Sequence, residues 1–522
     1  MDQIAIRGGL IVDGTGSEGR RADIGVTDGR ITRIATDVDA DQVIDAAGLV
    51  VSPGFIDLHS HADFTLEGWP GADTQLVQGV TTMVTGNCGF SPFPIDTEGR
   101  LERATAFMGP EISWSWPDAD GYGTTLQKAG PGANVITQIG HCSVRIAAMG
   151  QDERPPTPDE LARMQQSIID AARAGAYGFS TGLIYAPGTY AEESEVLALL
   201  RTAAEAGLIH STHMRNEGSG LLEAIAESIR GAEQTGIGVE ISHLKAMGPA
   251  NYGSVGDALA MIDEAVARGV DVQADVYPYT ASSTSLMSRL PSWALDGGPE
   301  AMQRRLADPE ERARIAAVVD EQTGKAFTPE GVVVSSIQPG RYASYGGRSL
   351  ASIAADLGRT PTETLLDVLQ EHGAGVSMIN HAIDPQDVAQ VLSHRLVAVA
   401  SDGWIMRPSG EGTPHPRSFG TFVRVLQHYV RETGLLSLAD AVHKMSGLPA
   451  KRLGLTDRGV LQPGAVADIA VFDANSVTEH STFDDPYQLA TGVEHVLVNG
   501  RPAVMNGQVS AERHGRVLRR AQ

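Results

Sequence analysis

A repeating order of helix, glycine and strand most limits the folds open to this chain. From about residue 157 the order recurs roughly every 30 residues, which is the length of one βα unit. In "TPDELARMQQSIIDAARAGAYGFSTG" we predict Thr157 as the N-cap, Pro158 at the first helical position and a stop near Gly175. The apolar face of this helix comprises Leu161, Met164, Ile168 and Ala172. An apolar strand follows it, and three later stretches repeat the unit.

Successive βα units build either an open doubly wound sheet or a closed (β/α)8 barrel of the TIM type. The positions of polar residues favour the barrel. His59, His213, His243 and Asp402 all lie at the ends of strand patterns, as does the region of Tyr277. Side chains from so many strand ends converge on one point only if the sheet closes on itself, so we predict an α/β protein with a TIM-like barrel.

The two ends of the chain differ from its middle, because they carry short strand patterns separated by Gly, Asp and Asn turns. We expect residues 1–50 and 456–522 to form one small β-sandwich domain and residues 51–455 to form the barrel. A stretch of about 286–345, much of it rich in Arg, Glu and Ala, is predicted to be a helical insertion over the barrel mouth. The chain has more than eight strand patterns, so 332–337 or 376–381 should belong to an insertion.

Charge and cysteine content argue against several classes of protein. The 64 acidic and 40 basic residues leave a formal charge of −24, which opposes binding to nucleic acid or anionic lipid. An anionic substrate would therefore need Lys or Arg side chains at its site. No signal-peptide pattern and no apolar run of about 18 residues occur, so we expect a cytoplasmic protein outside the membrane. Cys88 and Cys142 form no CxxC pair and are expected to be lone thiols.

Two histidines at the end of one strand pattern suggest a metal site. In "GFIDLHSHADF", His59 and His61 are two residues apart and would point to the same side of a strand. Such a pair alone is equally compatible with hydrogen-bonded core histidines. Cys88, which is followed by Gly89, and the residues His213, His243 and Asp402 end other strand patterns. Imidazole, thiolate and carboxylate are the ligands that zinc prefers, so the set favours a metal centre.

The sequence resembles the amidohydrolase superfamily and, within it, the N-acyl-D-amino-acid deacylases (D-aminoacylases). The resemblance covers essentially the whole chain and rests on the stretches "GFIDLHSHADF", "GVTTMVTGNCGFSPFP", "GFSTGLIYAPG", "THMRNEG", "SHLK", "DVYPYTASST", "SDG" and "HPRSFG". The segment "GNCG" narrows the match, because many binuclear relatives use a carboxylated lysine where deacylases of this type use a cysteine. The resemblance implies hydrolysis of an N-acyl-D-amino acid to a carboxylate and a free D-amino acid.

The resemblance also implies roles for individual residues. A tightly held zinc ion would lie at Cys88, His213 and His243, with a second, weaker position at His59 and His61. Cys88 would lie between the two positions. Asp402 would be the general base and would lie close enough to contact metal. The substrate carboxylate would be held by Lys245, Tyr277 and Arg417, with Ser283 nearby, and Tyr185 would line the acyl pocket.

Two other functions stay open at this point: a metal-dependent amidohydrolase acting on cyclic amides such as hydantoins, or on N-carbamoyl compounds, and a non-catalytic barrel scaffold. Activity against N-acyl-D-amino acids and hydantoins would separate the three. The segments "TGLIYAPGTYAEE" and "STSLMSRLPSW" are expected to set specificity, without naming the side chain or acyl group that they select. Residues with no settled role are His141, His381, Asp57, Asp63, Arg215 and Glu217.

Overall fold

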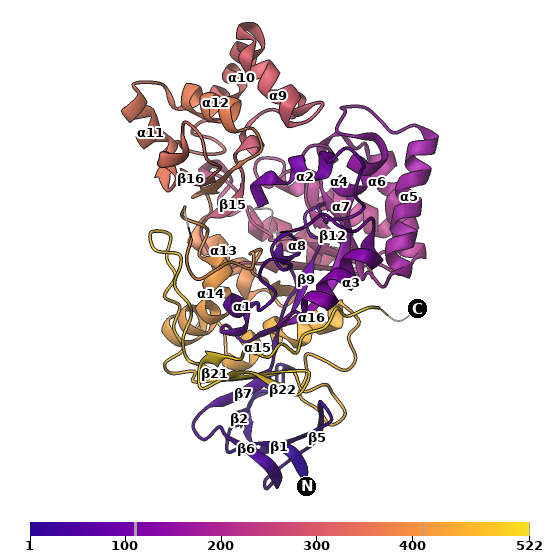
Figure 1. Ribbon diagram of the computed structural model, residues 1–522, viewed down its shortest axis with the longest axis vertical. Helices are drawn as coiled ribbons and strands as arrows, with labels where there is room; N and C mark the ends of the chain where they lie inside the picture. The colour runs from indigo at the N-terminus through magenta and orange to yellow at the C-terminus, as the bar shows by residue number, and fades with distance from the viewer. Residues whose placement is uncertain (109–111, 411, 521–522) are drawn as a thin grey trace.

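The computed structural model describes residues 1–108, 112–410 and 412–520, and its centre is a parallel β-barrel (Figure 1). Eight strands lie in the order β19-β14-β13-β12-β11-β10-β9-β8. Their bounds are β8 Phe55–Asp57, β9 Val80–Thr85, β10 Asn134–Gly140, β11 Gly178–Gly182, β12 Ile209–His213, β13 Val239–Ile241, β14 Val272–Val276 and β19 Val397–Val399. Just beyond β8 and β19, Ser60 and Gly403 form a parallel bridge that joins the first and last strands. The predicted TIM-like barrel is confirmed.

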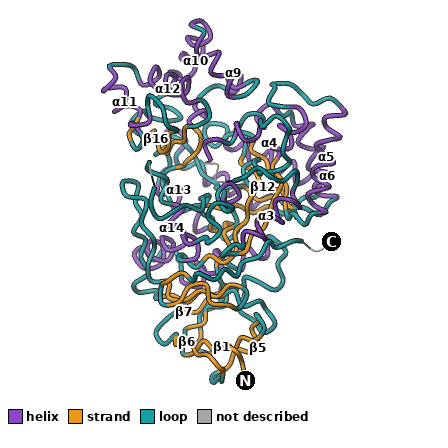
Figure 2. The backbone as a smooth tube through the Cα atoms, viewed as in Figure 1, coloured by secondary structure: helices purple, strands orange, loops and turns teal. Residues whose placement is uncertain are grey.

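Helices surround the barrel, and their boundaries follow local signals in the sequence (Figure 2). In α5, Pro158–Arg173, the Thr157 side chain accepts a hydrogen bond from the Glu160 N–H and completes a capping box. The predicted start of this helix is therefore confirmed. Other helices around the barrel are α3 Ala119–Ala129, α4 His141–Met149, α6 Glu193–Glu205, α7 Leu221–Thr235, α8 Val255–Ala267, α13 Pro385–Ser393, α14 Arg417–Arg424 and α15 Leu438–Met445.

Both chain ends contribute to a β-sandwich below the barrel (Figure 1). One sheet has the order β5-β4-β1-β6, with bounds β1 Asp2–Arg7, β4 Asp23–Thr27, β5 Arg30–Ala35 and β6 Ala40–Asp45. The other has the order β23-β22-β21-β20-β7-β2-β3, with bounds β2 Leu10–Ile11, β3 Arg20–Arg21, β7 Val50–Pro53, β20 Ile469–Phe472, β21 Val493–Val498, β22 Arg501–Met505 and β23 Gln508–Val509. Apolar side chains from both sheets, among them Ile24, Val51 and Leu497, share one buried core. The predicted sandwich of the two termini is confirmed.

The insertion over the barrel contains a sheet as well as helices (Figure 1). Antiparallel strands β15 Ser282–Ser285, β18 Val376–Asn380, β16 Val332–Ile337 and β17 Arg348–Ser349 pair in this order. The helices α9 Pro299–Ala307, α10 Pro309–Gln322, α11 Leu350–Leu357 and α12 Pro361–His372 pack against the same apolar core. Both 332–337 and the strand within 376–381 therefore lie outside the barrel. The sequence had predicted this for only one of the two segments.

The insertion is also longer than the predicted 286–345, because β15 pairs with β18 and so brings residues 282 and 380 together. The polar strand Ser282–Ser285 has no apolar alternation that could reveal it in the sequence. The division expected between residues 50 and 51 falls inside β7. Among the described residues, no helix has both the length and the apolar character needed to cross a membrane.

Candidate metal and substrate site

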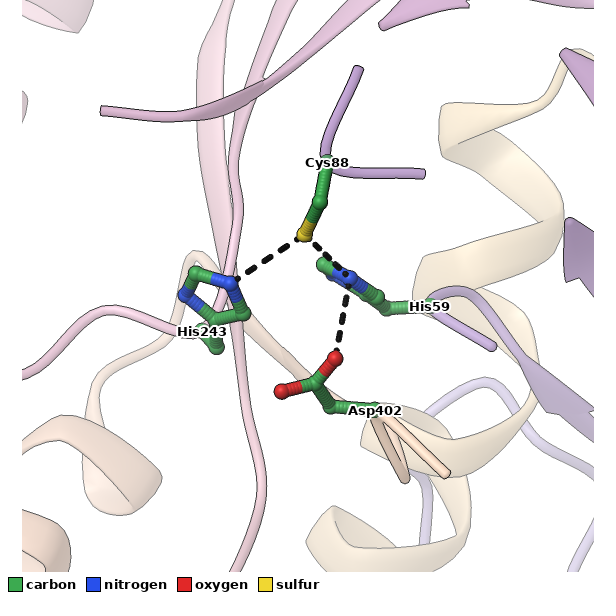
Figure 3. A group of neighbouring side chains, drawn as sticks. All are labelled: His59, Cys88, His243 and Asp402. Carbon is green, nitrogen blue, oxygen red and sulfur yellow. Dashed lines mark hydrogen bonds and ion pairs between the residues drawn. The ribbon is translucent and has the colours of Figure 1, made fainter. Parts of the chain in front are cut away.

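Four buried side chains meet at the mouth of the barrel (Figure 3). Cys88 Sγ lies 3.2 Å from His59 Nε2 and 3.4 Å from His243 Nε2. Asp402 Oδ1 lies 3.3 Å from the same His59 nitrogen. One ligand atom from each of these residues lies within 4.8 Å of the other three. A thiol, two imidazoles and a carboxylate therefore point into one small volume, as a metal site requires.

The other two predicted ligands border this group. His61 Nε2 lies 3.1 Å from Asp402 Oδ1. The His213 ring lies against the His243 ring with centroids 4.3 Å apart, and His213, Glu217 and His243 form a second set with ligand atoms within 4.8 Å. All six residues predicted to bind metal thus gather at one place. Their division into a tight and a weak position stays a prediction.

The backbone at three of these residues is held in the left-handed region. Cys88 has a φ of 54°, His243 of 36° and Asp402 of 51°. Such a conformation costs roughly 1–3 kcal/mol for a residue other than glycine and persists only where neighbouring contacts impose it. The His243 N–H donates to Asp275 Oδ1 at 2.7 Å, and the Asp402 N–H donates to the His59 carbonyl at 2.8 Å.

The turn that carries Cys88 also depends on close backbone packing. Gly89 has a φ of 79°, and a Cβ there would lie 2.5 Å from the Gly182 nitrogen. The Gly89 carbonyl accepts a hydrogen bond of 2.7 Å from the Cys142 N–H. The glycine after Cys88 thus allows close approach of β11 and of the start of α4.

Charges in the cluster suit a metal cation. Burial opposes ionisation of Cys88, but the neighbouring His59 and His243 outweigh it and hold the pKa of the thiol well below its usual range. Burial likewise opposes ionisation of Asp402, but Arg417 and His59 hold its pKa well below the usual value. Nδ1 of His213 and Nδ1 of His61 are buried without a hydrogen-bond partner in the described part of the chain, and His213 Nε2 lies 3.4 Å from Glu217 Oε2. Unsatisfied imidazole nitrogens beside an ionised thiol are a fit for a soft divalent metal.

The cluster opens into a cavity that is lined by both the barrel and the insertion. All the predicted site residues except His59 line it: His61, Cys88, Tyr185, His213, His243, Lys245, Tyr277, Ser283, Asp402 and Arg417. The Tyr277 hydroxyl and the Ser283 hydroxyl are buried without a partner among the described residues. Burial raises the pKa of Tyr277 well above its usual value, so this hydroxyl stays protonated and can donate a hydrogen bond to a ligand.

The two predicted cations of the substrate site already have carboxylate partners. Lys245 Nζ lies 2.5 Å from Glu217 Oε1 and 2.8 Å from His243 Nδ1. Arg417 Nη1 lies 2.7 Å from Asp402 Oδ2. Each cation therefore connects the substrate cavity with a residue at the metal cluster. A substrate carboxylate would share Lys245 and Arg417 with Glu217 and Asp402 rather than meet free cations.

Two residues have a larger place in the cavity than the sequence suggested. Glu217, which had no settled role in the sequence, contacts Lys245, His213 and His243 at once. Arg289 was not singled out within "STSLMSRLPSW", yet it lines the cavity with only 7% of its surface exposed. Its position in a predicted specificity segment, between Ser288 and Leu290, was the available signal.

The remaining polar residues lie around the site rather than in it. His141 begins α4 and lies 2.9 Å from Glu195 Oε1, and Cys142 is buried as expected, with burial raising the pKa of its thiol to about 12. His381 stacks edge-on against Phe483. Asp57 accepts hydrogen bonds from Ser401, beside Asp402, Asp63 accepts one from the Gly86 N–H, and Arg215 pairs with Glu227.

Comparison with known proteins finds relatives of the whole chain. A sequence model of the amidohydrolase family matches residues 42–504. An N-acyl-D-glutamate deacylase of Alcaligenes xylosoxydans xylosoxydans is 40% identical over 99% of this chain and 96% of its own, and a D-aminoacylase of the same organism is 35% identical over 99% and 97%.

Solved structures agree with these sequence matches. An N-acyl-D-glutamate deacylase from Bordetella bronchiseptica, in complex with zinc and a phosphonate that mimics the tetrahedral intermediate, has a TM-score of 0.85 and 37% identity over 99% of both chains. An L-hydantoinase from Arthrobacter aurescens has a TM-score of 0.59 at 18% identity over 100% of both chains, a likeness of fold alone.

Replacing Cys88 should remove bound metal. Cys88→Ala deletes the sulfur that lies within 3.4 Å of both His59 and His243, so we expect divalent-metal affinity to fall by more than about tenfold. The measurement is metal content by plasma mass spectrometry after dialysis against a weak chelator. Cys142→Ala is the matched control, since it deletes an equally buried thiol outside the cluster. Equal metal content in the two variants would contradict the assignment of Cys88.

Proposed function

This chain belongs to the amidohydrolase family, and we propose that it uses a bound zinc ion to hydrolyse the amide bond of N-acyl-D-amino acids. The observation that carries the proposal is the meeting of Cys88, His59, His243 and Asp402 at a cavity that also contains hydrogen-bond donors for a carboxylate. The similarity to two deacylases of D-amino acids over nearly the full chain supports the choice of substrate. The cytoplasm is the proposed compartment.

Zinc would be held by Cys88 with His213 and His243, and a second position would use His59 and His61. When bound, zinc lowers the pKa of a coordinated water toward about 7 and polarises a carbonyl. The thiolate and the unsatisfied nitrogens of His213 and His61 fit this ion better than they fit calcium or magnesium, which prefer oxygen ligands.

Asp402 would move protons during hydrolysis. Arg417 and His59 keep it ionised, and its Oδ1 faces both His59 and His61. It can therefore accept the proton of the attacking water and then pass that proton to the departing amine. Residues 178–182 match the GxSxG pattern, but Ser180 lies within β11 rather than at a strand-to-helix turn, and its hydroxyl donates to the Gly86 carbonyl and accepts from the Gly89 N–H. His59 and His243 beside Cys88 fit ligands rather than a base for a cysteine nucleophile.

The α-carboxylate of the substrate would lie among Lys245, Tyr277 and Arg417, with Ser283 beside them. Two buried hydroxyls without partners and two cations at one wall of the cavity form a site for an anion inside a protein with a net charge of −24. A hydantoin has no such carboxylate and would leave these donors unpaired. This argument favours the linear N-acyl amino acid over cyclic amides, and the complete set of metal ligands argues against a non-catalytic scaffold.

Arg289 supports an acidic side chain on the amino acid. It is buried, and its Nε has no partner. Its Nη2 donates to Ser288 Oγ at 3.4 Å and its guanidinium lies 5.5 Å from the Phe327 ring centroid, but among the described residues it forms no ion pair with a carboxylate. Burial lowers the pKa of Arg289 to about 10, so it still carries a charge at neutral pH. An unpaired buried charge is costly unless a ligand neutralises it. D-Glutamate or D-aspartate would do so, in agreement with the substrates named for two relatives.

The proposed function is tested with the zinc-loaded protein and N-acetyl derivatives of D- and L-amino acids, beside hydantoins and N-carbamoyl-D-amino acids. We expect hydrolysis of the D-compounds, with N-acetyl-D-glutamate and N-acetyl-D-aspartate among the best substrates. Turnover of hydantoins alone would contradict the proposal and indicate an amidohydrolase that acts on cyclic amides. No turnover at full zinc occupancy would favour a scaffold.

Tyr277→Phe should weaken binding of the α-carboxylate. The change removes one unpartnered hydroxyl and leaves the ion pairs of Lys245 and Arg417 intact, so we expect KM to rise about five- to tenfold with a smaller change in kcat. Steady-state kinetics with N-acetyl-D-glutamate measure both constants. Tyr342→Phe is the control, because Tyr342 is a buried tyrosine of the insertion core outside the cavity. An unchanged KM would exclude contact between Tyr277 and the substrate.

Arg289→Leu should change which side chain is accepted. Loss of a charge-assisted contact should lower kcat/KM for N-acetyl-D-glutamate by about 10- to 100-fold. N-acetyl-D-leucine should lose much less, because its side chain makes no ion pair. A ratio of the two kcat/KM values that stays at the wild-type level would refute the role of Arg289, whereas partial recovery in Arg289→Lys would support it.

A further inference from the structure

A second cavity lies beside the metal cavity and differs from it in chemistry. Its walls include Phe90, Ala104, Met287, Leu295 and Pro299. The polar residues at its walls are Gln151, Ser285 and Ser288, together with the Tyr185 hydroxyl. No charged side chain of the described residues lines it. Such a wall favours an uncharged apolar group and opposes a carboxylate.

The two cavities adjoin each other and share wall residues. Phe107, Ile184, Tyr185 and Ser288 line both of them. The Tyr185 ring lies edge-on to His213 with centroids 4.7 Å apart, and it lies 6.1 Å from the Phe90 ring. Thr284 donates a hydrogen bond of 3.1 Å to the Tyr185 hydroxyl and so fixes the ring. Tyr185 therefore stands between the metal cluster and the apolar cavity.

One short helix contributes an apolar residue to one cavity and a charged residue to the other. In η5, Leu286–Arg289, Met287 lines only the apolar cavity of the two, whereas Arg289 lines only the metal cavity. Lys245, Tyr277 and Arg417 are also absent from the apolar cavity. Two of the three substituents around the scissile amide, the α-carboxylate and the amino-acid side chain, thus have polar partners elsewhere. The acyl substituent is the one left without a site.

We propose that the apolar cavity is the acyl subsite and that it takes an unbranched aliphatic acyl chain longer than acetyl. The inference rests on the proposed function, since it places the scissile carbonyl at the metal cluster. Its chemistry excludes a dicarboxylic acyl group such as succinyl, because the terminal carboxylate would be buried among Phe90, Met287 and Leu295 without a cation.

The first test is the dependence of kcat/KM on chain length. For the N-acetyl, N-butanoyl, N-hexanoyl and N-octanoyl derivatives of D-glutamate, each added methylene should raise kcat/KM about fourfold until the cavity is full. N-succinyl-D-glutamate should be poorer than N-butanoyl-D-glutamate. If acetyl is hydrolysed but kcat/KM is flat or falls from acetyl to hexanoyl, the subsite assignment is overturned while the proposed function stands.

Variants of the cavity wall test whether the dependence of kcat/KM on acyl chain length arises in the apolar cavity. Leu295→Trp fills the cavity and Met287→Gln makes it more polar, so each should reduce the hexanoyl-to-acetyl ratio of kcat/KM toward one. Leu357→Trp is the matched control, because Leu357 is a partly buried leucine of the insertion that lines neither cavity, and it should keep the wild-type ratio. A wild-type ratio in both cavity variants overturns the proposal. The proposal is also overturned if the cavity variants change only the preference between N-acetyl-D-norleucine and N-acetyl-D-alanine. That result would assign the cavity to the amino-acid side chain.

A binding measurement does not depend on turnover. Hexanoate, the carboxylate product of the N-hexanoyl substrate, should bind the zinc-loaded protein more tightly than acetate in calorimetry, by about tenfold or more. Leu295→Trp should remove this difference and Leu357→Trp should retain it. Equal binding of hexanoate and acetate by the wild-type protein would overturn the subsite even if the enzyme acted on another amide.

Discussion

The hydrogen bond from the Asp402 N–H to the His59 carbonyl, 2.8 Å long, closes the ring of strands, and the site depends on it. The His61 N–H donates to the Gly403 carbonyl at the same joint. These bonds bring the first and last strands of the barrel together although they are far apart in the chain. Without closure, Asp402 would have no place beside His59 and His61, and the cluster would lose its carboxylate. The chemistry therefore follows from a backbone constraint.

Electrostatics explain how a protein with a net charge of −24 can bind an anion. Lys245, Arg289 and Arg417 lie in one cavity, where burial strengthens their field relative to the solvated acidic surface. Glu217 and Asp402 pair with two of these cations and also face the histidines, so the metal and substrate positions share the same charges. A substitution that alters the charge at one position should therefore change binding at the other position.

The barrel and the insertion supply different residues to the site. Strand ends of the barrel supply the candidate metal ligands, whereas Ser283, Met287 and Arg289 come from β15 and η5 at the start of the insertion. The sheet pairing of β15 with β18 fixes these residues over the barrel mouth. Substitutions in the insertion can therefore alter the accepted substrate while the ligands stay in place.

The sequence by itself determined the barrel, the terminal sandwich and the residue types of the metal cluster, because helical periodicity, capping by Thr157 and the position of His59 and His61 at a strand end are local signals. Tertiary structure decided the rest. The reach of the insertion to Asn380 depends on pairing between β15 and β18, which are about 90 residues apart in the chain. The pairing of Lys245 with Glu217, the position of Arg289 over the Phe327 ring and the apolar cavity arise from contacts between distant segments, and no local pattern encodes which neighbour a buried charge will find.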